Sequence, residues 1–222
     1  MTRLTWLLVA LALLGMPAVA LAADDVASTP HNLSTSGTGT IHATGGTDAN
    51  QICVFCHTPH MSSLTGPLWN RTASAGPFTM YTSPTLDMII GTSPQGVSAA
   101  CLSCHDGTVA FDSLLNKPGM GAGAPTDWVF TGATVDKKMP AGVTNLGTDL
   151  SDDHPISITY DTTKDAAFNA IASGKVGTLP LYGAGKNQVE CGTCHNPHDN
   201  SLDLFLRATN AASALCKTCH IK

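Results

Sequence analysis

The cysteines of this chain, eight in number, all fall into pairs of a single pattern. Two residues separate the members of each pair and a histidine follows each pair directly, so the pattern Cys-x-x-Cys-His occurs four times. The cysteines are Cys53 and Cys56, Cys101 and Cys104, Cys191 and Cys194, and Cys216 and Cys219; the histidines are His57, His105, His195 and His220. This pattern is the attachment signature of c-type haem.

The spacing matches the chemistry of that attachment. Thiols at positions i and i+3 of a helical turn lie on one side of the chain, where they can bond to both vinyl groups of a haem. The next residue then presents its imidazole to the iron as the proximal ligand. Paired cysteines also occur in zinc ribbons and in disulfide-bonded secreted proteins, but neither class requires a histidine after every pair. The sequence therefore predicts four covalently attached c-type haems.

The histidines that remain are nearly equal in number to the irons. Of the 9 histidines, four are proximal, which leaves His31, His42, His60, His154 and His198. Four irons need four second ligands, so this count favours ligation by two histidines at every haem. Methionine is the competing ligand, and the candidates are Met61, Met80, Met88, Met120 and Met139. A methionine that packs in the interior is nevertheless the commoner case.

The surroundings of these histidines differ. His60 and His198 each end a Cys-His-x-Pro-His stretch, in which the proline stops the attachment helix. We expect each of them to reach the iron of a neighbouring haem. His154 follows two aspartates, and a carboxylate there could orient its ring. His31 and His42 lie in a segment rich in Gly, Ser and Thr, and on the residues alone they are equal candidates for the fourth place.

An internal repeat divides the chain. The stretch Cys-x-x-Cys-His-x-Pro-His occurs at 53–60 and 191–198, and an apolar segment ending in arginine and a plain Cys-x-x-Cys-His follow each copy. We expect a first di-haem half over 51–150 and a second over 151–222, preceded by an arm over 23–50, in one compact tetrahaem unit. The two arginines, Arg71 and Arg207, could pair with haem propionates or be solvated.

The composition leaves little side-chain volume for an ordinary core. Aromatic residues are 5% and charged residues 12% of the chain. Four haems are large apolar bodies that would replace such a core, so we expect no folded protein without them. We predict a mostly irregular fold, wrapped around stacked haems, with a few short α-helices and very little β-structure. The expected helices cover 83–91, 162–173 and a last stretch from Thr209 or Asn210 through Cys219, and the expected loops cover 113–150 and 174–190.

The N-terminal residues predict export. Arg3 precedes a short apolar run and small residues suited to cleavage after Ala22, so we expect residues 1–22 to be a signal peptide and the mature chain to be secreted. A retained anchor helix is the alternative. The apolar run is too short to span a bilayer, and we expect no membrane span in the mature chain. The net charge of −5 argues against nucleic acid as a partner.

Several runs of the sequence carry a resemblance to a known family. They are ICVFCHTPH at 52–60, PLWNR at 67–71, YTSPTL at 81–86, CLSCHDG at 101–107 and CGTCHNPH at 191–198. Over most of the chain after residue 30 they resemble the doubled CXXCH multihaem cytochromes and, among these, the OmcE-like tetrahaem cytochromes. The resemblance implies bis-histidine haems stacked in an alternating parallel and T-shaped chain. It also implies subunits on the outer cell surface that polymerise into conductive filaments.

In that family a neighbouring subunit supplies one distal histidine, which makes the row of haems continuous across the interface. This role carries over to the early arm histidine, His31, whereas His42 has no counterpart. On this basis we expect the distal ligands to be His31, His60, His154 and His198. The expected partners are further copies of this chain, together with redox proteins or extracellular electron acceptors.

Three classes of function remain open. Electron transfer, as a filament subunit or a soluble periplasmic shuttle, needs only six-coordinate haems. A small reductase of nitrogen or sulfur oxyanions needs one haem with an open position, and five second ligands for four irons force no such vacancy. A docking subunit of a larger membrane complex is the third class, which the absence of a mature membrane anchor disfavours.

Overall fold

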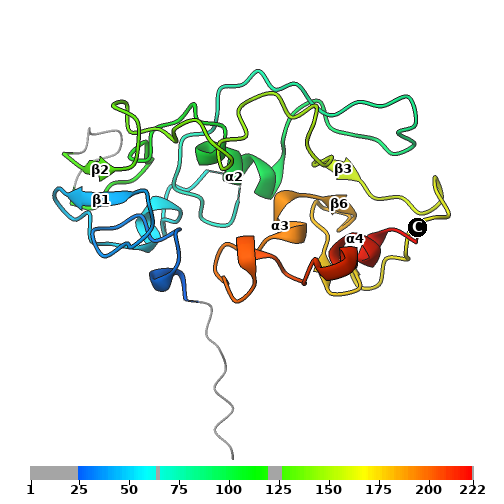
Figure 1. Ribbon diagram of the computed structural model, residues 1–222. Coiled ribbons are helices and arrows are strands. Elements are labelled where there is room, and N and C mark those ends of the chain that lie inside the picture. Colours follow the sequence, from blue (N-terminus) through cyan, green and yellow to red (C-terminus); the bar gives the residue numbers. More distant parts are fainter. Residues whose placement is uncertain (1–24, 64–65, 120–126, 222) are drawn as a thin grey trace, which may run out of the picture.

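The computed structural model describes residues 25–63, 66–119 and 127–221. The expected signal peptide, residues 1–22, and Met120 lie outside the described residues. In Figure 1 the strands β1 (His42–Gly45) and β2 (Val129–Thr131) lie at one end of the molecule, and β3 (Ile158–Thr159) and α4 (Ala214–Cys219) lie toward the other, while the teal segment that precedes α2 runs along the molecule to the side of β3. Helix α2, Gly96–His105, lies near the middle and packs against α3, Cys191–Cys194. The two halves therefore meet at the second and third attachment motifs.

The regular elements of the described residues are short and few. Besides α2 and α3, the structure has α4, Ala214–Cys219, and the 3-10 turns η1 Val26–Ser28, η2 Cys53–Phe55, η3 Asp203–Phe205 and η4 Ala211–Ser213. The strands form three antiparallel pairs: β1 His42–Gly45 with β2 Val129–Thr131, β3 Ile158–Thr159 with β6 Gln188–Val189, and β4 Lys175–Val176 with β5 Leu179–Pro180. This confirms the prediction of a mostly irregular chain with little β-structure.

Two of the expected helices do not form. In 83–91 the Ser83 hydroxyl accepts the Thr85 amide at 3.2 Å, and the chain makes a single turn before extending. In 162–173 the carboxylates of Asp161 and Asp165 accept backbone amides two residues on, which favours turns over helix. The same segment pairs with the last attachment motif, since the Asn169 amide donates to the Cys219 carbonyl at 2.9 Å. Tertiary pairing has outweighed local helix propensity here.

The predicted last helix forms only over its second part, from Ala214, because Ala212 and Ser213 have φ of 50° and 60° and interrupt the helix before that point. Helix α4 carries Cys216 and Cys219, and the turn η4 precedes it. The Thr209 hydroxyl accepts the Ala211 amide at 3.2 Å, but the residues that directly precede η4 and α4, Asn210 and Ser213, make no side-chain capping bond, so the expected cap does not form. None of the helices in the described part of the chain has the length and apolar character needed to cross a bilayer.

Two small cores flank the attachment motifs. The first holds Phe55 and Trp128, whose ring centroids are 4.9 Å apart, and Cys56 and Cys104 border it. The second lies under β3 and β6, contains Ile158 and Tyr160, and is bordered by Cys219. Each core thus has attachment cysteines at its edge, and the second core also takes in Leu86, Met88 and Ile90 of the first half.

Candidate haem attachment sites

Each Cys-x-x-Cys-His stretch forms one helical turn that ends at its histidine. The turn is closed by a hydrogen bond from the histidine amide to the carbonyl of the first cysteine, at 2.8 Å for His57, 3.0 Å for His195 and 2.9 Å for His220. The second stretch, at 101–105, is the last turn of α2, which ends at His105. Both thiols and the imidazole of each motif therefore leave the same turn, as covalent haem attachment requires.

Backbone carbonyls orient the proximal rings of the first three motifs. Nδ1 lies 3.0 Å from the Pro67 carbonyl in His57, 2.8 Å from the Thr144 carbonyl in His105 and 2.7 Å from the Leu204 carbonyl in His195. A carbonyl can only accept, so Nδ1 carries the proton and donates. Nε2 is then the unprotonated nitrogen, which is the tautomer that binds a metal. The ring of the fourth, His220, lies 4.6 Å from that of Phe168.

The internal repeat is also a structural repeat. After each Cys-His-x-Pro-His stretch the chain returns antiparallel to it, pairing His57 with Trp69 and His195 with Leu206. Each return segment contains a leucine in the left-handed region, Leu68 at φ 55° and Leu204 at φ 59°. That conformation costs about 1 kcal/mol for a leucine. In the first half this leucine follows Pro67, whose carbonyl orients the proximal ring. In the second half Leu204 itself supplies that carbonyl.

Neighbouring attachment sites lie close together in the order of the sequence. Burial, with a contribution from nearby Cys104, raises the pKa of the Cys56 thiol to about 12. A hydrogen bond between Cys101 and Cys191 raises the pKa of the first and lowers that of the second. Burial, with Cys219 nearby, raises the pKa of Cys194 to about 11. The first site thus adjoins the second, the second the third, and the third the fourth.

Two of the expected distal histidines face proximal histidines. The rings of His57 and His198 have centroids 6.0 Å apart and planes at 21°. The rings of His31 and His105 have centroids 6.2 Å apart and planes at 89°. These contacts join the first half to the second half and to the arm.

A backbone carbonyl and an aromatic ring from the second half hold His31 in place. Its Nδ1 lies 3.3 Å from the Pro197 carbonyl, and its ring centroid lies 4.4 Å from that of Phe205. Burial, followed by the charge of nearby His105, lowers the pKa of His31 to about 4. The ring is therefore neutral near neutral pH, in the form that ligates metals. The sequence gives no local signal for Pro197 and Phe205, which lie more than a hundred residues away.

The other three candidate histidines are placed differently. His60 and His154 are exposed, and the acceptor 3.0 Å from Nδ1 of His154 is the Pro155 carbonyl. His42 begins β1 and is half-buried, with Nδ1 2.7 Å from the Gly39 carbonyl.

The two arginines of the repeat differ in their surroundings. Arg71 is 1% exposed, and its guanidinium donates to the carbonyls of Ser103, Ala110 and Phe111 and to the Ser103 hydroxyl. Arg207 is half-buried and donates from Nε to the Gly192 carbonyl at 2.7 Å. Arg71 therefore links the end of α2 to residues 110–111 inside the first half and is not a solvated side chain.

Large apolar side chains are exposed beside the attachment motifs. Met61 is 73% exposed, Leu68 52%, Leu204 75% and Ile221 60%, and each lies next to a proximal histidine or its return segment. A porphyrin bound at the neighbouring turn would cover such side chains. With the closed turns and the oriented rings, this placement fits covalently bound haem.

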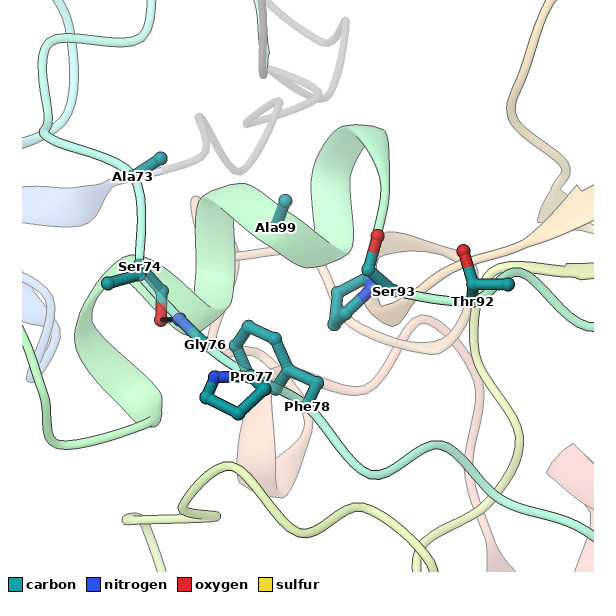
Figure 2. A pocket seen from close by; sticks show the side chains of 10 residues that line it. Ala73, Ser74, Gly76, Pro77, Phe78, Thr92, Ser93 and Ala99 are labelled. Carbon is teal, nitrogen blue, oxygen red and sulfur yellow. Dashed lines mark hydrogen bonds between the residues drawn. The ribbon is translucent and has the colours of Figure 1, made fainter.

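A hollow of about 380 Å³ lies beside α2, and Figure 2 shows the side chains that line it. They belong to segments 73–78 and 92–94 and to Ala99, and among them are no histidine, cysteine or acidic residue. The hollow thus offers small and apolar surface, and its lining supplies no metal ligand or general base.

Comparison with known proteins supports the class that the sites define. Residues 184–222, which hold the third and fourth attachment motifs, match the family model for the doubled CXXCH motif. No curated protein matches the chain. The match and the geometry together support a multihaem c-type cytochrome, an electron carrier with covalently bound haem. The same attachment turn stands twice more in the first half, at 53–57 and 101–105.

Proposed function

We propose that this chain is a secreted tetrahaem c-type cytochrome that passes electrons along four adjacent haems with two histidine ligands each. The observation that carries this is the set of four closed Cys-x-x-Cys-His turns, whose thiols adjoin in sequence order. When bound, haem iron supplies reversible one-electron exchange. The chain contributes the attachment thiols and the oriented imidazoles.

We further propose that the protein is the repeating subunit of an extracellular conductive filament. The resemblance described above supports this, since the family places a histidine of one subunit on a haem of the next. The ring of His31, the residue to which that role carries over, lies against His105 of its own chain. We therefore assign the bridging role to one of the exposed histidines, His60 or His154.

A direct experiment measures haem content and assembly on protein exported from an expressing cell. The expected results are a mass that corresponds to four haems on a chain beginning at Ala23, low-spin ferric spectra, and regular filaments in electron micrographs of sheared cell-surface material. Dispersed particles with four low-spin haems would support the soluble periplasmic shuttle instead. A stable high-spin signal together with turnover of nitrite would support the reductase.

A further inference from the structure

The two facing histidine pairs match the separation required of two axial ligands on one metal. A bond from metal to imidazole nitrogen is about 2 Å long, and the ring centre lies roughly 1 Å beyond it, so two trans ligands place their ring centroids roughly 6 Å apart. The observed separations are 6.0 Å for His57 and His198 and 6.2 Å for His31 and His105. Ring stacking alone can also give such a distance, so the experiment must separate the two.

Both pairs contain a proximal histidine whose Nδ1 is already bonded to a carbonyl. In His57 that carbonyl belongs to Pro67, and in His105 it belongs to Thr144. In the same way, Nδ1 of His31 is hydrogen-bonded to the Pro197 carbonyl. In each of these three rings Nε2 is thus the nitrogen left to bind metal. Simple stacking does not require this common orientation.

We propose that the loop 195–198 of the second half completes both haem sites of the first half. His198 is the second axial ligand of the haem attached at Cys53 and Cys56. His31, held by the Pro197 carbonyl, is the second axial ligand of the haem attached at Cys101 and Cys104. This assignment rests on the proposed tetrahaem function and deepens it, because it states which histidine serves which haem.

The ring planes give the assignment a spectroscopic signature. Planes at 21° in the first pair remove the near-degeneracy of the iron d-orbitals, and a rhombic low-spin signal is expected in electron paramagnetic resonance. Planes at 89° in the second pair preserve the near-degeneracy of these orbitals, so a strongly anisotropic low-spin signal with one large g-value is expected. One spectrum of the oxidised protein should therefore contain both types.

The test replaces each distal histidine in the haem-loaded protein. His198→Ala should remove one rhombic component, and His31→Ala should remove one strongly anisotropic component, each with the appearance of one high-spin haem. The matched control is Asn200→Ala, an exposed position close to His198, which should leave the spectrum unchanged. Added imidazole should restore a low-spin signal in each histidine variant, which shows that the variant is folded and has lost only a ligand.

The outcomes separate this inference from the proposed function. A wild-type protein without four haems, or without low-spin iron, would overturn the proposed function itself. A wild type with four low-spin haems whose spectrum is unchanged in both histidine variants would overturn only the ligand assignment. Loss of the rhombic component in His31→Ala and of the anisotropic one in His198→Ala would overturn it as well.

Discussion

The two halves of the molecule carry the same attachment turn but differ in what faces it. In the first half His57 and His105 each face a second histidine, and Arg71 braces the fold with four hydrogen bonds. In the second half His195 is exposed, and Phe168 packs against the last proximal ring. The comparison teaches that the repeat determines the turn that carries the proximal histidine, whereas the ring that faces a first-half proximal histidine comes from the arm or from the second half.

The largest expected effect comes from removing one second-half haem. In Cys191→Ala/Cys194→Ala the loop 195–198 loses its anchor, so we expect the loss of that haem and high-spin iron at both first-half sites. Cys216→Ala/Cys219→Ala should lose its own haem alone. Haem content by pyridine haemochrome and spin state by electron paramagnetic resonance measure both. Equal spectral losses in the two variants would show that the halves are independent.

The next effect concerns the two arginines. Arg71→Met leaves three buried carbonyls without their donors and should lower the free energy of unfolding by about 3 kcal/mol or more, whereas Arg207→Met should cost about 1 kcal/mol. Guanidinium titration of the haem-loaded variants measures the difference. If Arg207→Met lowers the free energy of unfolding more than Arg71→Met does, the expected order is wrong, and the arginine of the second half contributes more to stability.

A smaller effect is expected from the aromatic residues two places before each arginine. Phe205 packs on His31, and Trp69 packs edge-on against His57 with centroids 5.7 Å apart. Phe205→Leu should shift the strongly anisotropic signal and leave the rhombic one, and Trp69→Leu should do the reverse, each with about 1 kcal/mol lost in stability. Identical spectra in both variants would contradict this division.

The smallest effect concerns Glu190, which directly precedes the repeated motif of the second half. Ile52 holds the same position in the first half and does not titrate. Glu190 is 2% exposed, forms a capping box with Thr193, and burial raises its pKa. The unfolded chain therefore releases this proton at lower pH than the folded protein, and stability falls as the pH rises from 4.5 through the raised folded value. Glu190→Gln should lack this slope.

The measurement for Glu190 is the unfolding midpoint of wild type and Glu190→Gln below pH 4.5 and at neutral pH. The difference between the two proteins should change with pH in the stated sense. A Thr193→Ala variant removes the partner of the capping box and keeps the titrating group, so it serves as the control. A wild type that gains stability over this range relative to Glu190→Gln would contradict the expectation.

Local chemistry made part of the molecule predictable from its sequence. The attachment turns follow from residue spacing, and helix α4 carries the last of them although it begins at Ala214 and not at the expected Thr209 or Asn210. The helices expected at 83–91 and 162–173 were wrong, because serine and aspartate side chains bind nearby amides and the second segment pairs with the chain around Cys219. The facing of His57 by His198 could not be derived, because nothing in either segment encodes a contact between distant parts of the chain.

The loop 195–198 has a consequence for how the protein is made. In the proposed secreted tetrahaem protein the first two attachment motifs are made before this loop, so haems could be joined to their thiols before the proposed His198 ligand is in place. Maturation would then pass through a stage in which early haems carry a single histidine and are open to oxygen and to stray ligands. That stage would end when the C-terminal residues are in place and the proposed ligands bind the early irons. The last part of the chain to be made would then shield the haems that were attached first.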